Sequence, residues 1–199
     1  MHPANTTGAG HSVLYYGSLE TQHVLQVFLE ARDAGSATMA ESLLGTIRKA
    51  ADDGRFVVQF HFAANIDDEF GGRGSRRSLS ALGAAADVGA GEFVAFLDAL
   101  FSCQPACFAH DSLCDPRFLL DVAGRVPGLR SDGFDQKVLK DTYADWAATA
   151  AAAFQLCGLW GTPTILFDKR VIWLDKLVVL GVPRDPMLTP RQFLASIRA

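Results

Sequence analysis

The residues with the clearest potential for chemistry are Glu20 and His23, three positions apart in the segment GSLETQHV (17–24). This segment follows a short apolar run at residues 12–16, and we predict that it opens a helix. Side chains three positions apart share one face of a helix. A carboxylate that orients a neutral histidine can move a proton on a bound ligand, so the pair is a candidate for acid–base catalysis. The alternative is structural: Glu20 caps the helix and His23 lies on the surface.

The four cysteines are the second group of reactive residues. Cys103, Cys107 and Cys114 have the spacing C-x3-C-x2-H-x3-C with His110, and Cys157 lies apart from them. This spacing differs from the C-x2-C or C-x4-C knuckles of common zinc modules, so we expect no metal and no other cofactor. Free thiols are the default in a reducing cytosol. A zinc site, and a disulfide or redox pair of Cys103 and Cys107, remain alternatives.

The composition indicates a folded domain with a large core. The chain has 199 residues, is 49% hydrophobic and carries a net charge of −4. No dense run of Lys and Arg is present, which argues against nucleic acid or an anionic membrane surface as a partner. No stretch approaches the ~20 apolar residues that span a bilayer. The first twelve residues lack the features of a secretory signal, so we expect a cytoplasmic protein.

The first third of the chain has the pattern of a strand, a helical stretch and a second strand. Short apolar and aromatic runs predict the strands, and broad apolar faces predict the helices. The predicted elements are a strand at 12–16, a helix over 17–29, a second helical run over 39–51 and a strand at 56–62. Between the two helical runs, Gly35-Ser36 is interpreted as a break.

The rest of the chain is first helical and then strand-forming. A polar, glycine-rich loop is predicted at 65–78, with Asp67, Asp68 and Glu69 solvating a turn, and helices dominate up to residue 159. A β-hairpin follows at 165–174, and the last helix is opened by Thr189-Pro190. The order β-α-β, helical block, β-β-α fits one mixed sheet with an inserted helical lobe.

Four segments together resemble the DsbA-like family of thioredoxin-fold proteins, including its FrnE-related branch. They are the strand–turn–helix at 13–29, IDDEFGGRGSRRSLSALGAAADVG, EFVAFLDALFSCQP and CGLWGTPTILFDKRVI. The resemblance covers about residues 12–199. It implies a thioredoxin-like α/β fold. The thioredoxin-like domain would consist of residues 12–64 and 160–199, and an all-helical insertion would consist of residues 65–159.

The Gly-Thr-Pro-Thr element at 161–164 implies where a ligand binds. In thioredoxin folds the proline at this place follows a cis peptide bond, which X–Pro bonds adopt at modest cost. By resemblance this is Pro163. The backbone of Thr162 then faces outward, where it can pair with an extended peptide or a thiol-bearing ligand.

The family's reactive Cys-x-x-Cys pair is where this chain departs from the pattern. The resemblance places the first cysteine at Glu20 and the second at His23, so residues 20–23 read Glu-Thr-Gln-His. Disulfide exchange needs a thiolate at a helix start and a second thiol, so none is expected here. The candidate catalytic residues are Glu20 and His23, and the candidate ligand contacts are Thr21, Thr162 and Pro163.

The leading functional hypothesis is a non-redox protein that binds a peptide or small thiol ligand beside Pro163. A homodimer is a possible oligomeric state. One alternative is a glutathione-type transferase or isomerase with His23 as base, because related folds use this place without redox chemistry. The other is a thiol–disulfide oxidoreductase that works through Cys103 and Cys107.

Overall fold

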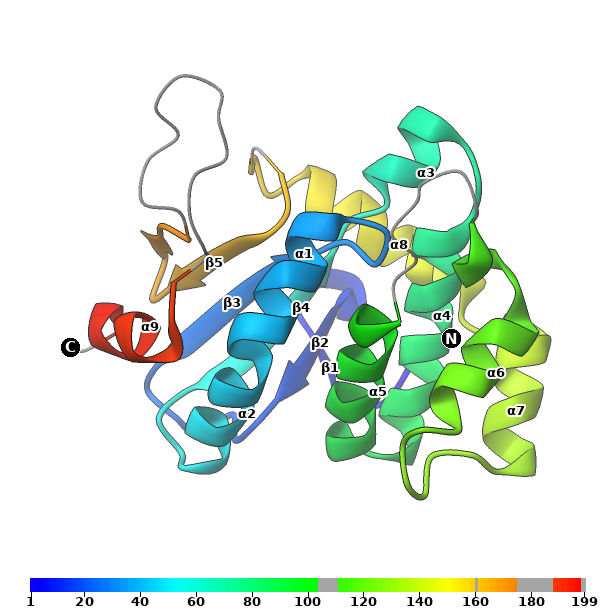
Figure 1. Cartoon of the computed structure of the whole chain (residues 1–199), viewed down its shortest axis with the longest axis horizontal. Helices are drawn as coiled ribbons and strands as arrows, with labels where there is room; N and C mark the ends of the chain where they lie inside the picture. Colours follow the sequence, from blue (N-terminus) through cyan, green and yellow to red (C-terminus); the bar gives the residue numbers. More distant parts are fainter. Residues whose placement is uncertain (104–110, 160, 175–187, 198–199) are drawn as a thin grey trace.

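A mixed sheet of six described strands forms one side of the molecule, on the left in Figure 1. The computed structural model describes residues 1–103, 111–159, 161–174 and 188–197. The strands are β1 (Thr6–Thr7), β2 (Val13–Tyr16), β3 (Val24–Leu29), β4 (Val57–Phe62), β5 (Thr164–Phe167) and β6 (Arg170–Ile172). They are ordered β1-β2-β4-β3-β5-β6 across the sheet. β3 is parallel to β4 and antiparallel to β5, so it is hydrogen-bonded on both sides.

Strand β3 contradicts the helix predicted over 17–29. Leu25, Val27 and Leu29 of this strand are buried in the main core, and the residues between them face the other side of the sheet. A short apolar run fits a buried strand as well as a helix. The two neighbouring strands satisfy the backbone groups of β3 and decide in favour of the strand.

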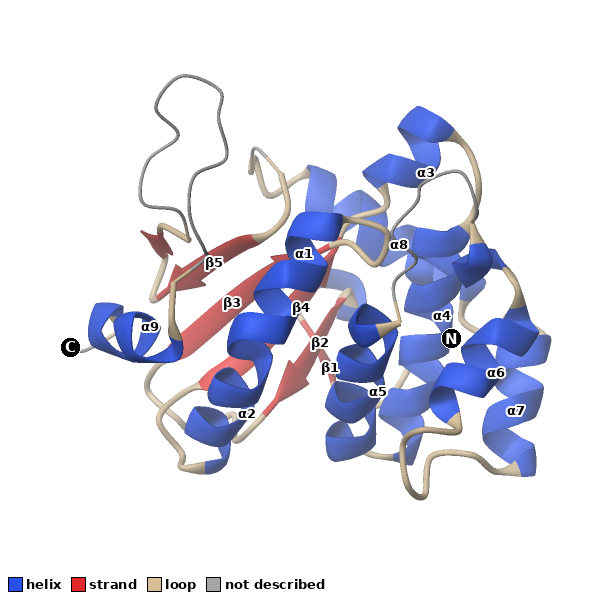
Figure 2. Ribbon diagram, in the orientation of Figure 1, coloured by secondary structure: helices blue, strands red, loops and turns tan. Residues whose placement is uncertain are grey.

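The parallel pair β3 and β4 requires a crossover, which a helical segment supplies on one face of the sheet (Figure 2). This segment consists of α1 (Ala34–Met39), a π-helical stretch (Ala40–Leu44) and α2 (Gly45–Asp52). Asp33 caps its first turn by accepting hydrogen bonds from the N–H groups of Gly35 and Ser36. The break predicted at Gly35-Ser36 is therefore wrong, because both residues belong to that first turn.

The described chain between β4 and β5 is mainly helical. Its helices are α3 (Asn65–Phe70), α4 (Gly74–Val88), α5 (Ala90–Ser102), α6 (Pro116–Ala123), α7 (Asp132–Leu139) and α8 (Ala144–Gln155). Short 3-10 turns are formed by Ala9–His11 and Ser112–Cys114. The loop predicted at 65–78 is wrong in part, since α3 and the start of α4 occupy it. Figure 1 shows α4 to α7 gathered beside the sheet, and Phe60 of β4 meets Phe93 of α5 edge to face within one continuous core.

The second strand pair follows this helical block, as predicted. β5 and β6 form a hairpin whose turn residues, Asp168 and Lys169, have positive φ angles of 47° and 67°. Two-residue hairpin turns favour this conformation. The last described helix, α9 (Pro190–Ser196), begins with a capping box of Thr189 and Gln192. In the ranges given above, no helix is long and apolar enough to cross a bilayer.

Candidate functional site

The peptide bond between Thr162 and Pro163 is cis and lies in the loop that leads from α8 to β5. Because Thr164 pairs with Phe28, this loop lies at the carboxyl end of β3. The segment of residues 30–33 leaves the sheet at that same end and leads into α1. The cis-proline loop and the start of α1 thereby lie at the same end of the sheet, where β3 ends (Figure 1).

Asp33 links these two segments. Its carboxylate accepts hydrogen bonds from the N–H groups of Gly35 and Ser36, at 3.0 and 2.8 Å, and from the Ser36 hydroxyl at 2.7 Å. The Thr162 hydroxyl donates to the same carboxylate at 3.1 Å. Four neutral donors thus hold the Asp33 side chain between the helix start and the residue before the cis-proline.

The first turn of α1 also packs closely against the proline. A Cβ atom at Gly35 would lie 2.9 Å from Cδ of Pro163, which is shorter than a van der Waals contact. The missing side chain is what permits this approach. Ser36 lies in the same turn, is fully buried and accepts a hydrogen bond from the N–H of Glu30 at 3.1 Å. The candidate site is therefore built from Asp33, Gly35 and Ser36 on one side and the cis-proline loop on the other.

Glu30 anchors the segment that carries this site to the helical lobe. Its carboxylate accepts hydrogen bonds from the N–H groups of Asn65 and Ile66, at 3.2 and 2.8 Å. The Ser75 hydroxyl of α4 donates to it at 2.8 Å. Burial raises the pKa of Glu30, although these hydrogen bonds favour its charged form and work in the opposite direction.

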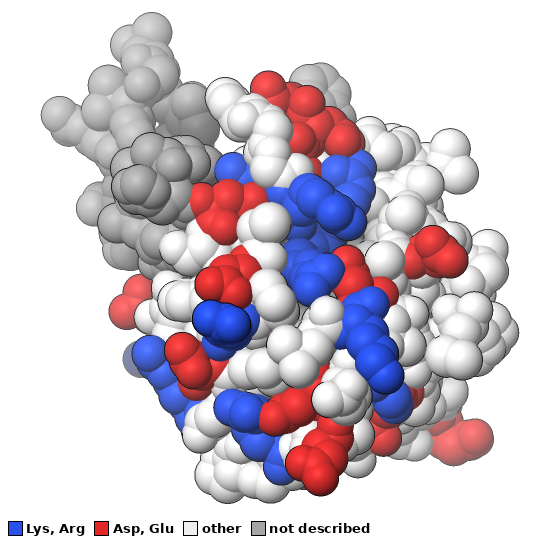
Figure 3. Space-filling view, turned by 90° about the vertical axis from the view of Figure 1, so that its right-hand side faces the viewer, with Lys and Arg blue, Asp and Glu red and all other residues white. Residues whose placement is uncertain are grey.

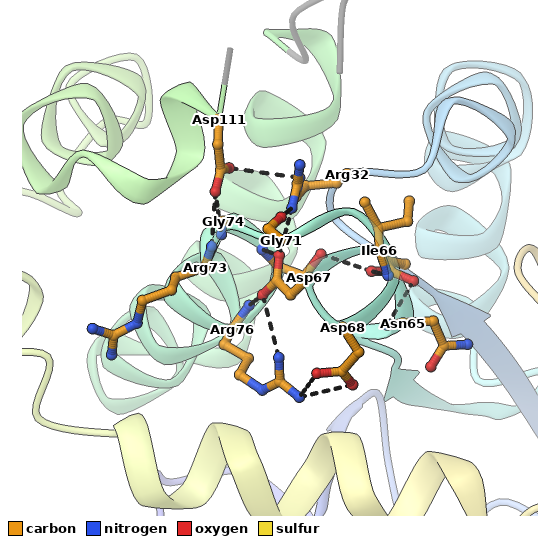
Figure 4. A network of polar contacts seen from close by, with 12 residues as sticks. Arg32, Asn65, Ile66, Asp67, Asp68, Gly71, Arg73, Gly74, Arg76 and Asp111 are labelled. Atoms are coloured by element: carbon orange, nitrogen blue, oxygen red, sulfur yellow. Dashed lines mark hydrogen bonds and ion pairs between the residues drawn. The ribbon is translucent and has the colours of Figure 1, made fainter. Parts of the chain in front are cut away.

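Arg32 is the second anchor of the same segment (Figure 4). Its Nη1 donates to Oδ1 of Asp67 at 2.9 Å and to the carbonyl oxygen of Gly71 at 2.7 Å, and its Nε lies 3.6 Å from Oδ1 of Asp111. The side chain of Asp67 is fully buried and also accepts hydrogen bonds from two N–H groups in the first turn of α4. The prediction that Asp67 solvates a turn is therefore wrong.

The other arginines near the start of α4 are paired as well. Arg76 contacts Asp68 at 2.8 Å, and Arg77 contacts Asp141 at 2.6 Å. Figure 3 shows basic and acidic side chains next to one another on this side of the molecule. Charge in this region is therefore largely balanced within the chain.

Glu20, Thr21 and His23 lie at the opposite end of β3 from the cis-proline loop. The first two are in the turn between β2 and β3, and His23 immediately precedes β3, so no helix starts there. The six residues of β3 span roughly 20 Å. The structure brings Thr162 and Pro163 together with Asp33. The prediction of a cleft between Glu20, His23 and Pro163 is therefore wrong.

His23 is oriented by Asp168, and not by Glu20 as predicted. Its Nδ1 lies 2.7 Å from Oδ2 of Asp168, and Oδ1 of Asp168 accepts a hydrogen bond from the N–H of Val24 at 3.0 Å. The hydrogen bond from Val24, followed by that from His23, lowers the pKa of Asp168. This pair ties the turn before β3 to the β5–β6 hairpin.

The Asp168→Asn substitution is expected to cost less than about 1 kcal/mol of stability at neutral pH, because the pair is partly exposed. The folded-state pKa of Asp168 lies below its unfolded value of about 3.9. Its charge therefore stabilises the fold above that pH, and the contribution is lost as the pH falls through the lower folded value. Asparagine tolerates the positive φ of this turn. Urea unfolding of both proteins between about pH 7 and pH 3 measures the difference, and a difference that stays constant with pH would contradict the assignment.

The family of this chain follows from a comparison with family models. The model described as Thioredoxin matches residues 10–178, a range that includes strands β2 to β6 and the helical lobe. The chain belongs to the thioredoxin family.

Solved structures of similar fold place this thioredoxin-family chain beside DsbA-type proteins. MdbA, a thiol-disulfide oxidoreductase from Actinomyces oris, is 19% identical with a TM-score of 0.73, over 94% of this chain and 84% of that one. Reduced DsbA from Mycobacterium tuberculosis is 17% identical with a TM-score of 0.73, over 94% and 90%. BdbD from Bacillus subtilis is 19% identical with a TM-score of 0.68, over 86% and 90%. A search of curated proteins found no match. The predicted DsbA-like thioredoxin fold with a helical insertion is confirmed.

The cysteines of this thioredoxin-family chain are free thiols wherever they are described. Cys103, at the end of α5, accepts a hydrogen bond from Nη1 of Arg125 at 2.6 Å, and Cys114 is exposed. Cys157 follows α8, and burial raises the pKa of its thiol. Cys107 and His110 lie outside the described residues, so the two alternatives that involve them, a Cys103–Cys107 pair and a zinc site, stay untested. Among the side chains that the structure describes, no three of His, Cys, Asp or Glu gather into a metal site.

Asp33, Gly35 and Ser36 are not among the site residues predicted from sequence. The sequence nevertheless contains a pattern that indicates a helix start at Asp33. An aspartate followed by a helical pattern is a typical N-cap. The run at residues 24–29, which is apolar except for Gln26, ends just before this segment and is consistent with a buried strand. Interpreting 24–29 as a strand would have moved the predicted helix start from residue 17 to Asp33.

Proposed function

We propose that this chain is a DsbA-like protein that binds an extended peptide or a small thiol ligand beside Pro163 and does not exchange disulfides there. One observation supports the proposal: the helix start that faces the cis-proline holds Asp33 and Ser36. Two residues separate them, the spacing of a Cys-x-x-Cys pair. They therefore take the positions that we first assigned to Glu20 and His23.

The chemistry of these two side chains favours binding over electron transfer. Disulfide exchange needs a thiolate that attacks sulfur and a second thiol that resolves the product. A carboxylate and a hydroxyl can do neither. The Asp33 carboxylate caps α1, and the Ser36 hydroxyl is buried between that carboxylate and the N–H of Glu30. Both groups therefore stabilise the helix start that a ligand would contact.

Thr162 supplies the groups that an extended ligand would use. Its side chain is held by Asp33, which fixes the orientation of the loop. Its N–H and C=O make no hydrogen bond to another described residue. A backbone with free donors and acceptors can pair with an added strand, which is a common mode of peptide recognition.

The double substitution Asp33→Cys with Ser36→Cys is expected to create a disulfide-exchange activity that the unmodified chain lacks. A thiol at the start of α1 would have a lowered pKa, and the second thiol would resolve the mixed disulfide. The measurement is insulin reduction by dithiothreitol, in which the unmodified chain should not exceed the background rate.

The control for this experiment introduces the same two thiols at the position predicted from sequence. Glu20→Cys with His23→Cys has the same spacing, but it lies in the turn before β3. This variant should stay inactive. Activity in the control, and none in the Asp33 and Ser36 variant, would refute the assignment of the site.

An oxidoreductase that acts through Cys103 and Cys107 is the second candidate, and one contact favours it. The guanidinium of Arg125 donates to Sγ of Cys103, which is partly exposed, and reactive cysteines typically lie in such electropositive, partly exposed surroundings. Insulin reduction by the unmodified chain that disappears in the Cys103→Ser, Cys107→Ser variant would establish this function in place of the first.

A further inference from the structure

We infer that the ligand beside Pro163 is an extended peptide that places a lysine or arginine side chain against Asp33. This inference rests on the proposed function and adds the chemical class of its ligand. The observation behind it is a fixed carboxylate, without a cationic partner in the described chain, next to the backbone of Thr162.

The charge of Asp33 is not cancelled by its own hydrogen bonds. Its four donors are two backbone N–H groups and two hydroxyls, and all of them are neutral. Such donors fix the position of the carboxylate, but they do not neutralise its negative charge. The neighbouring Arg32 does not supply the missing cation, because it is buried and pairs with Asp67 and Asp111.

Asp33 is also held where a side chain of the ligand would lie. The Thr162 hydroxyl donates to it, so the carboxylate lies within one side chain's reach of the backbone that the ligand would pair with. An extended peptide directs alternate side chains to opposite sides, and one set would face the start of α1. Gly35 has no side chain and Ser36 is buried, so Asp33 is the charged group that this set would meet.

The same carboxylate disfavours other ligands. An acidic side chain or a thiolate at this place would be repelled, and a neutral side chain would gain nothing from the charge. An exposed ion pair of this kind corresponds to roughly a fivefold change in affinity. Salt should weaken the preference, because exposed charges are screened.

Three fluorescein-labelled nonapeptides test the inference. They are identical and otherwise uncharged, and they differ only in a central Arg, Gln or Glu. In fluorescence anisotropy titrations of the unmodified chain, we expect the Arg peptide to bind roughly fivefold more tightly than the Gln peptide. The Glu peptide should bind most weakly, and the three affinities should converge as sodium chloride is raised.

Asp33→Asn separates the charge from the cap. Asparagine is as good an N-cap as aspartate, so the helix start should persist. In this variant the Arg peptide should fall to the affinity of the Gln peptide. The matched control is Glu20→Gln, which also removes one carboxylate but at the other end of β3, and it should leave the order of affinities unchanged.

The possible outcomes separate this inference from the proposed function. If the three peptides bind the unmodified chain equally, and Pro163→Ala abolishes that binding, the cationic ligand is refuted while peptide binding at the cis-proline stands. If no peptide binds, the inference and peptide binding by the proposed function are both refuted, and only a small thiol ligand beside Pro163 is left of that function. A preference for the Arg peptide that persists in Asp33→Asn also overturns the inference.

Discussion

Replacing Arg32 by methionine is expected to lower the free energy of unfolding by about 3–5 kcal/mol. The Arg32 side chain is 7% exposed and pairs at 2.9 Å with an Asp67 side chain that is 0% exposed. Methionine retains an apolar stem, but it leaves the Asp67 carboxylate buried without its close cation. Urea unfolding at neutral pH measures the loss as a lower midpoint with an unchanged slope.

The matched control is the same substitution at Arg76. This arginine also faces Asp67, at 3.8 Å, and contacts the exposed Asp68 at 2.8 Å. Its side chain is 36% exposed, and pairs of this kind contribute less than about 1 kcal/mol. Similar losses in the two variants would contradict the importance that we assign to burial of the Arg32 pair.

The anchoring by Arg32 and Glu30 explains how the helical lobe contributes to a site in which none of its described residues places a side chain. Both residues lie in the segment that connects β3 to Asp33, and their partners belong to the lobe. The position of the Asp33 carboxylate therefore depends on α3 and α4 as well as on the sheet. This arrangement makes the inserted lobe part of the framework of the site.

Local sequence correctly predicts the elements whose pattern is compatible with only one type of secondary structure. The strand predicted at 56–62 is β4, because a stretch rich in β-branched and aromatic residues follows a helix stop at Gly54. The hairpin of β5 and β6 follows from its two-residue turn. Thr189-Pro190 is an equally direct signal for the start of α9.

Strand β3 shows where local pattern stops being sufficient. Its apolar run has the length of a strand, but its spacing also produces an apolar helix face. The partners that make it a strand, β4 and β5, are distant in sequence. Because the sequence pattern predicts the helix start one element too early, it directs attention to Glu20 and His23 and not to the first turn of α1.

The buried ion pair of Arg32 and Asp67 was outside the reach of any local pattern. The two residues are 35 positions apart, and three consecutive acidic residues at 67–69 usually indicate a solvated turn. Only the tertiary contacts of Asp67, with Arg32 after β3 and with the N–H groups of Ser75 and Arg76 in α4, make it a buried partner. Tertiary contact therefore decides the role of this carboxylate.

The substitution Gly35→Ala is expected to lower the free energy of unfolding by about 1–3 kcal/mol. The new Cβ would lie 2.9 Å from Cδ of Pro163, an atom of a ring that cannot rotate away. Either the first turn of α1 or the cis-proline loop must move, and the hydrogen bond from Thr162 to Asp33 would be strained with it. Urea unfolding measures the stability, and binding of the Arg nonapeptide should weaken in parallel.

Gly45→Ala is the control, because it should change the free energy of unfolding in the opposite direction. Gly45 lies in the same helical segment, and a Cβ there would meet nothing within 4 Å. Alanine usually stabilises a helix over glycine by about 0.5–1 kcal/mol, so Gly45→Ala should raise the free energy of unfolding. The same chemical change should therefore act in opposite directions at two positions of one helical segment. If both substitutions stabilise the protein, α1 does not approach Pro163 closely, and the site built on that approach is wrong.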